Sequence, residues 1–261
     1  MKKSKSTEKK NKSNDVGLKG LPFLLGGLFI ILWQLAVDIL KIQPYILPGP
    51  VDVMKALYKE RILLLSHTIV TLSEALIGFG IAVVLGVVLG ILMGYYNIIR
   101  RMFYPLFVIS QTIPLIVLTP LFAIWFGFGL LPKVLIIILG CFFPITVAFT
   151  QSLLKTDEDM DELLSVMGAS RWKSFLLVRI PQALPGLFAG LRIAVTYSIM
   201  GAVISEWVGA QKGLGIYMTR AMTSFKTAVL FADVLIIVLL SMGLYKLVEI
   251  IERKITKNII Y

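Results

Sequence analysis

The sequence has little of the residues that carry most metal and redox chemistry. Its 261 residues include one cysteine, Cys141, and one histidine, His67. One cysteine excludes a disulfide bond within the chain, and one histidine excludes a histidine-rich metal site. We therefore predict that this chain binds no metal and no cofactor. His67 is expected either to be satisfied inside the fold or to face solvent.

The sequence also lacks the motifs of a nucleotide-hydrolysing enzyme. A phosphate-binding GxxxxGK[ST] loop needs a glycine followed by lysine, and that pair does not occur. The GFG at 78–80 and the GLG at 213–215 lack this lysine, so we interpret them as packing or turn glycines. A GxSxG motif with a histidine partner is missing as well, which argues against a hydrolase. The prediction is a chain that is not itself an enzyme.

Charged residues are scarce, and this scarcity indicates the class of protein. They make up 16% of the chain, against 57% hydrophobic residues, and the mean hydropathy is +0.87. Such a balance is typical of an integral membrane protein. The net charge of +11 lies in short segments beside apolar runs, as membrane topology requires. The basic excess therefore predicts a lipid membrane as partner and no nucleic acid.

Six apolar runs are long enough to cross a membrane as helices. They cover about residues 20–40, 69–96, 106–127, 134–150, 187–208 and 228–250. We predict an all-α membrane domain over residues 20–250, with a disordered basic tail before it (1–19) and a basic tail after it (251–261). Lysine and arginine gather at both ends of the chain and in the connections at 97–103 and 151–186, so both termini are expected in the cytoplasm.

Two of these runs have internal features that bear on function. In the second run, glycines at every fourth residue from Gly86 to Gly94, with Gly78 on the same face, predict close helix packing. The third run contains Pro114 and Pro120, so its backbone hydrogen bonds must be interrupted inside the membrane. Such breaks are tolerated where they face protein or a water-filled path.

Polar residues and prolines in or beside these runs are candidates for a translocation path. Each polar side chain either lines the path or bonds to a neighbouring helix. Glu206, next to Trp207, is either a gate contact or an acid exposed at the outer boundary. The candidates are Gln111, Thr112, Pro114, Thr119, Pro120, Ser205 and Glu206.

The polar stretch 161–186 lies between two long apolar runs. Gly168 is placed to end one helix in a left-handed conformation, and Ser170 to cap a second, short helix. Pro181 and Pro185 are expected to end that helix. The pattern predicts an elbow with one small exposed face that fits a groove in a partner protein; the face consists of Trp172, Phe175 and Leu176.

This stretch resembles the EAA loop of the permease subunits of ATP-binding-cassette importers. The resemblance rests on the spacing of Glu162, Gly168, Val178, Ile180 and Pro181. The sequence departs from the family at residues 163 and 164, where two leucines replace the usual alanines. The segments QTIPLIVLTPLFAIWFGFG, FFPI and SEWVGAQKGLG look like the branch that handles nitrate, sulfonates, taurine and pyrimidine precursors of thiamine, and the resemblance covers about residues 20–250.

The resemblance implies a type I importer fold in the cell membrane, with a cytoplasmic coupling loop at 151–186. Two such permeases, expected to be identical, pair with two ATPase subunits that bind ATP and magnesium, and with an extracytoplasmic solute-binding protein. The residues implied in ATPase coupling are Glu162, Gly168, Ala169, Ser170, Trp172, Phe175 and Pro181.

The solute stays open between two classes. One is an anion such as a sulfonate, taurine or nitrate, and the other is a pyrimidine-type vitamin precursor. The predicted spans have no lysine or arginine near a membrane midplane, where a tightly held anion would need one, so the heterocycle is favoured. The alternative function is an ion-coupled secondary transporter, although internal repeats and midplane ionisable groups are not evident.

Overall fold

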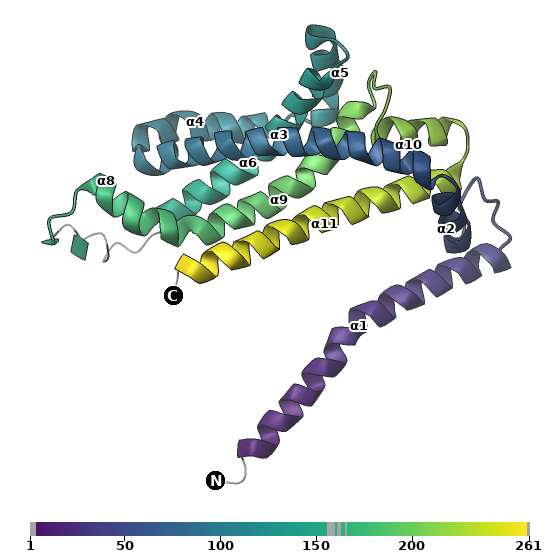
Figure 1. Ribbon diagram of the computed structural model, residues 1–261, viewed down its shortest axis with the longest axis horizontal. Helices are drawn as coiled ribbons and strands as arrows, with labels where there is room; N and C mark the ends of the chain where they lie inside the picture. The colour runs from purple at the N-terminus through teal and green to yellow at the C-terminus, as the bar shows by residue number, and fades with distance from the viewer. Residues whose placement is uncertain (1–3, 156–159, 161–162, 165, 260–261) are drawn as a thin grey trace. The chain divides into compact units, whose positions relative to one another are not determined.

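The computed structural model describes residues 4–155, 160, 163, 164 and 166–259. All regular structure in these residues is helical (Figure 1). The elements are α1 (Ser4–Ile39), α2 (Pro50–Lys59), α3 (Arg61–Tyr95), α4 (Asn97–Ser110), α5 (Leu115–Phe126), α6 (Leu130–Leu154), α8 (Arg171–Ser174), the π-helical segment η1 (Phe175–Arg179), α9 (Ile180–Glu206), α10 (Leu214–Thr223) and α11 (Thr227–Ile259).

The chain divides into two compact units, Met1–Arg61 with Ala221–Ala232 and Ile62–Arg220 with Asp233–Tyr261. In the first unit, the ring of Trp33 on α1 packs against Phe231, with ring centroids 5.7 Å apart. The helix α1 begins at Ser4. The disordered tail that the sequence predicts over residues 1–19 stays a prediction.

Five helical segments of the described chain are long and apolar enough to cross a membrane, or six when the bent pair α4 and α5 counts as one span. They are residues 20–39 of α1, all of α3 and α6, the segment from Arg171 to Glu206, and residues 227–257 of α11. The predicted all-α class with about six spans is therefore confirmed.

The third predicted span is broken where the sequence indicates. The helices α4 and α5 form an angle of 96°, and Gln111–Pro114 lie between them outside any helix. Pro114 precedes α5 as its N-cap residue and has extended backbone angles. Because proline has no N–H, it cannot continue the hydrogen bonds of the preceding turn. Pro120 lies inside α5 without ending it, so only one of the two prolines interrupts the helix.

The glycines of α3 pack against α6, as their spacing predicts. A Cβ atom at Gly86 would lie 2.8 Å from Cγ2 of Ile145, closer than real contacts allow. The same close approach to a side chain of α6 recurs at three further glycines of α3: Gly78, Gly90 and Gly94. The absence of side chains on this face lets the two helices touch along their length.

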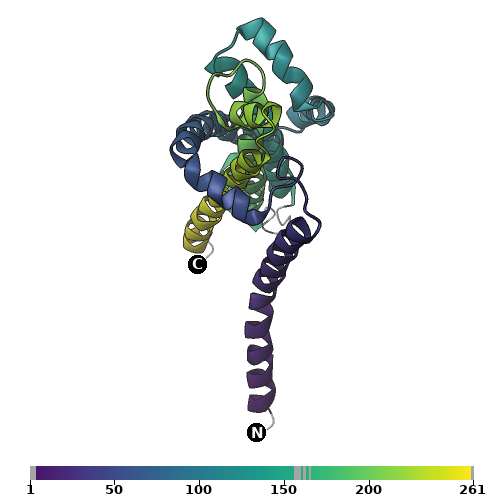
Figure 2. The ribbon, with the colours of Figure 1, turned by 90° about the vertical axis from the view of Figure 1, so that its right-hand side faces the viewer.

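Helix α9 packs along α6 on one side and α11 on the other (Figures 1 and 2). The thiol of Cys141 on α6 donates a hydrogen bond to the carbonyl oxygen of Ala194 on α9 (3.1 Å). Arg192 of α9 and Glu252 of α11 form an ion pair of 2.5 Å. The charge of Arg192 is therefore balanced within the fold.

The helices after the elbow are continuous, which corrects one prediction. From Arg171 to Glu206 the chain forms one helical segment through α8, η1 and α9, so Pro181 and Pro185 do not end the short helix. The N–H of Ile180 donates to the carbonyl oxygen of Phe175, five residues earlier. This wider turn accommodates Pro181 in the first turn of α9, where a missing N–H costs little.

Candidate functional site

Three consecutive backbone N–H groups at the start of α10 are held by three side chains of α3 and α9. The pairs are Gly213 N with His67 Nδ1 (2.9 Å), Leu214 N with Thr71 Oγ1 (2.8 Å) and Gly215 N with Glu206 Oε2 (2.6 Å). The first turn of a helix has no partners of its own for these donors, so the three side chains complete it. We call His67, Thr71 and Glu206 the α10 cap.

Glu206 is the centre of this cap. Its side chain is fully buried, and its second carboxylate oxygen accepts a hydrogen bond from the hydroxyl of Thr71 (2.6 Å). A Cβ atom at Gly213 would lie 2.2 Å from the carboxylate carbon of Glu206, so only glycine lets the backbone approach this closely. The alternative of an acid exposed at the outer boundary is therefore wrong, because the turn before α10 covers the carboxylate.

His67 is satisfied inside the fold, which is one of the two outcomes expected for it. It is buried, accepts a hydrogen bond from Gly213 and stacks on Tyr217, with ring centroids 4.8 Å apart. Sequence reasoning did not single out Thr71. The available signal was spacing, because residues 67, 71, 74 and 78 lie on one face of a helix.

A buried ion pair lies on the same face of α3. The amino group of Lys133, in the first turn of α6, is 2.6 Å from Oε1 of Glu74. Among the described residues, Oε2 of Glu74 has no hydrogen-bond partner. The pair ties α3 to the start of α6. The sequence marks Glu74 as an acid near the end of the second apolar run, but no local pattern indicates Lys133 as its partner.

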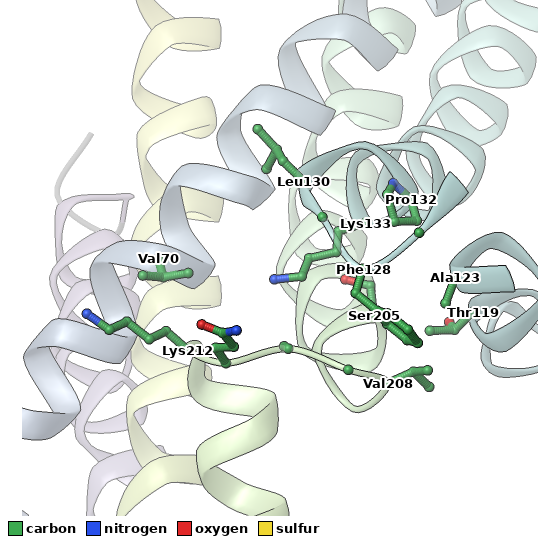
Figure 3. Close-up of a pocket in the computed structure, with 15 residues that line it drawn as sticks. Val70, Thr119, Ala123, Phe128, Leu130, Pro132, Lys133, Ser205, Val208 and Lys212 are labelled. Carbon is green, nitrogen blue, oxygen red and sulfur yellow. The ribbon is translucent and has the colours of Figure 1, made fainter. Parts of the chain in front are cut away.

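A cavity of about 490 Å³ adjoins this ion pair, and we call it the loop cavity. Residues from α3, α5, the loop before α6 and its first turn, the end of α9 and the loop after α9 line it (Figure 3). Two predicted path residues, Thr119 and Ser205, line it, together with Lys133, Gln211 and Lys212. Glu206 does not line it.

A second cavity of about 470 Å³ lies at the break between α4 and α5, and we call it the break cavity. Gln111 and Pro114 line it, with Tyr197 and Phe122 as aromatic neighbours. The amide of Gln111 donates to the carbonyl oxygen of Leu139 at 3.5 Å, which is a weak contact. The predicted path residues are thus divided between two cavities. Thr112 and Pro120 line neither of them.

The elbow has the turn that the sequence predicts. Gly168 adopts a positive φ of 81°, and the N–H of Ala169 donates to the carbonyl oxygen of Leu164 (2.9 Å). The hydroxyl of Ser170 accepts a hydrogen bond from the N–H of Lys173 (3.3 Å) and caps α8. Glu162 lies outside the described residues.

Three aromatic rings, those of Tyr95, Trp172 and Phe175, pack together at the elbow. Tyr95, at the end of α3, meets Trp172 and Phe175 edge to face, with ring centroids 5.1 Å and 5.2 Å apart. Trp172 is 48% exposed, whereas Phe175 is 2% exposed and packs against Phe149 and Leu153. The prediction that Phe175 belongs to an exposed docking face is therefore corrected, because η1 turns its ring into the core.

Within the described chain, no three histidine, cysteine, aspartate or glutamate residues are placed to hold a metal ion. The buried polar groups hold α10 against α3 and α9, and the start of α6 against α3. The result is a helical scaffold with two cavities and a supported elbow.

Comparison with known proteins agrees with this arrangement. The family model described as "Binding-protein-dependent transport system inner membrane component" matches residues 82–257. The chain is 38% identical over 220 residues to the formylaminopyrimidine transport permease protein ThiX of Halalkalibacterium halodurans, which covers 84% of this chain and 88% of ThiX. It is 30% identical over 243 residues to the putative aliphatic sulfonates transport permease protein SsuC of Bacillus subtilis, which covers 92% of this chain and 87% of SsuC.

A solved structure of the MetNI methionine ABC transporter contains a chain with the same fold. The TM-score is 0.65 at 21% sequence identity, and the match covers 76% of this chain and 98% of that chain. The matched family model extends over more than half of the sequence, from α3 into α11. This chain therefore belongs to the family of binding-protein-dependent inner membrane transport components, the permease subunits of ATP-binding-cassette importers.

Proposed function

We propose that this chain is the transmembrane subunit of an ATP-driven importer and that its elbow docks onto a separate ATPase subunit. The observation that carries the proposal is the exposed ring of Trp172, held on a rigid base by Tyr95 and Phe175. Exposed aromatic side chains that are already ordered make strong anchors in protein interfaces. Around this anchor, the coupling residues are Glu162, Gly168, Ala169, Ser170 and Pro181.

The proposed assembly has two permeases, two cytoplasmic ATPase subunits and an extracytoplasmic solute-binding protein. The family description, which names binding-protein-dependent transport, supports the third partner. ATP and magnesium belong to the ATPase subunits in this proposal, because this chain has no phosphate-binding loop. Both chain termini and the elbow lie in the cytoplasm, where ATP is available.

The proposed solute is a neutral or weakly basic heterocycle such as a pyrimidine-type vitamin precursor. Support comes from the break cavity, whose lining includes two aromatic residues, Phe122 and Tyr197, and Gln111, but no charged side chain among the described residues. A fixed anion site would need a cation or a helix N-terminus. The greater identity to the formylaminopyrimidine permease than to the sulfonate permease points the same way.

One experiment tests the ATPase partner and the solute class separately. The chain is purified in mild detergent, the proteins that accompany it are identified, and the complex is reconstituted in vesicles with its binding protein. We expect an ATPase subunit to co-purify and ATP to drive uptake of the pyrimidine. Uptake driven by an ion gradient without an ATPase would overturn the proposal in favour of a secondary transporter, and ATP-driven uptake of a sulfonate alone would overturn the solute class.

A further inference from the structure

A third cavity, of about 460 Å³, lies where α4 begins and α6 ends. It is separate from the loop cavity and the break cavity, and two adjacent arginines line it. From this geometry we propose that it is a binding site for the phosphate headgroup of an anionic phospholipid. We call it the arginine cavity; its lining residues are Arg100, Arg101, Tyr104, Pro105, Thr150, Gln151 and Leu154.

The charge of the cavity is positive and locally unbalanced. Arg100 and Arg101 are adjacent on the first turns of α4, and within the described chain neither forms an ion pair with a carboxylate. Arg100 donates one hydrogen bond to the side chain of Asn97 (2.6 Å), which leaves its other N–H groups for a ligand. The first turn of α4 carries no acidic residue, so the positive end of the helix adds to this field.

Uncharged hydrogen-bonding groups complete the cavity. Tyr104 and Gln151 also line it, and their side chains carry a hydroxyl and an amide. Thr150 is 1% exposed, and in the part of the chain that the structure describes its hydroxyl has no hydrogen-bond partner. A buried threonine in a helix usually bonds to the preceding turn, so the unpaired hydroxyl of Thr150 is a donor that a phosphate oxygen reaching the cavity wall can satisfy.

The surroundings favour a lipid over a free phosphate. The cavity lies at the end of α6, a helix long and apolar enough to span the membrane. Large apolar side chains next to the arginines are exposed, among them Ile98 (73%) and Met102 (63%), and Leu154 of the cavity wall is exposed as well. Acyl chains lie against such side chains while the headgroup reaches the arginines, and basic pockets between membrane helices bind anionic headgroups.

The test uses the protein purified with the subunits that accompany it. Retained lipid is measured by native mass spectrometry, and the unfolding temperature is measured with added phosphatidylglycerol, phosphatidylcholine or inorganic phosphate. We expect phosphatidylglycerol to be retained and to raise the unfolding temperature, with little effect of phosphatidylcholine. Equal protection by inorganic phosphate would overturn the lipid assignment, since a free anion would then suffice.

Two matched double variants decide the location. Arg100→Gln with Arg101→Gln is expected to weaken phosphatidylglycerol binding by on the order of tenfold or more, since each lost cation weakens attraction to an anionic lipid. Lys254→Gln with Lys257→Gln removes the same charge from exposed positions of α11 and should change little. Equal losses in both variants would show attraction to overall charge and overturn the site. Thr150→Val, which keeps the volume, is expected to cause a smaller loss than the arginine pair.

Discussion

The carboxylate of Glu206 and the hydroxyl of Thr71 are 2.6 Å apart, although 135 residues separate them in the sequence. This bond joins the end of α9 to α3, and the other carboxylate oxygen holds the first turn of α10. Both oxygens of this fully buried carboxyl group are thus hydrogen-bonded, which offsets the cost of burying them. The three helices are therefore fixed together at one point.

Replacing Glu206 by glutamine should weaken the contact that joins α9 to α3 and α10. The amide keeps one oxygen, but its NH₂ group then faces one of two hydrogen-bond donors, Thr71 or Gly215. We expect a loss of about 1–3 kcal/mol in stability, the usual consequence of a buried donor without an acceptor. The unfolding temperature in detergent and proteolysis of the loop before α10 are the measurements. Glu60→Gln, at a half-buried position that ends α2, is the control, and an equal effect there would contradict the cap.

Two glycines of α3 test the close packing against α6. Gly86→Ala should destabilise the fold, because its Cβ atom would lie 2.8 Å from Cγ2 of Ile145 and 3.2 Å from a backbone oxygen of α6. Gly80→Ala, on the same helix, meets nothing within 4 Å and should be neutral or stabilising by about 0.5–1 kcal/mol. Thermal unfolding of both variants gives the comparison. Similar values for the two would rule out the packing face.

At the elbow, Gly168 tests conformation alone. Its φ is 81°, and a Cβ atom there would meet nothing within 4 Å, so the cost of a side chain is backbone strain of about 1–2 kcal/mol. We expect Gly168→Leu to reach the membrane at ordinary levels but to lose transport, because the turn re-aims α8. Gly168→Asn should retain more transport, since asparagine tolerates this conformation best. Normal transport by the leucine variant would contradict the prediction that transport needs the left-handed turn at residue 168.

Trp172 and Phe175 should separate docking from stability. Trp172→Ala removes an exposed ring and is expected to weaken association with the ATPase subunit at least tenfold while the permease stays folded. Phe175→Ala removes a ring that is 2% exposed and should cost about 3–5 kcal/mol of stability. Pull-down with the ATPase and thermal unfolding are measured for both. The reverse assignment, with Trp172 controlling stability, would contradict the docking role.

The topology can be tested with single cysteines. The native Cys141 is fully buried, so labelling of the unmodified chain should be low. We expect labelling only from the cytoplasm at Lys10→Cys, Arg100→Cys, Ser170→Cys and Lys257→Cys, and only from outside at Pro50→Cys and Lys212→Cys. The inside positions follow from the distribution of lysine and arginine. One site labelled from the wrong face would require a different number of spans.

Local patterns in the sequence predict much of this structure. The glycine spacing of α3, the break before Pro114 and the turn at Gly168 each depend on residues close together in the chain, and all three are confirmed. They are predictable because backbone geometry and helix periodicity are local properties.

The burial of Glu206 and Phe175 depends on the rest of the fold. Glu206 is covered because α10 turns back onto α3, and no local pattern around residue 206 contains that contact. Phe175 faces the core because the π-helical turn of η1 rotates it away from the exposed side. The prediction that Pro181 and Pro185 end the short helix was wrong for the same reason. The wider turn before Pro181 removes the clash that would end a regular helix.

The continuous helix from Arg171 to Glu206 has a mechanical consequence. Its 36 residues, at a rise of about 1.5 Å each, give a helical path roughly 54 Å long measured along the axis. One end carries the exposed ring of Trp172, and the other ends at Glu206, whose carboxylate accepts a hydrogen bond from the first turn of α10. The described backbone has no loop between Trp172 and Glu206. A tilt imposed at the elbow would therefore also move the C-terminal end of α9, and the hydrogen bond between Glu206 and Gly215 would transmit this movement to α10.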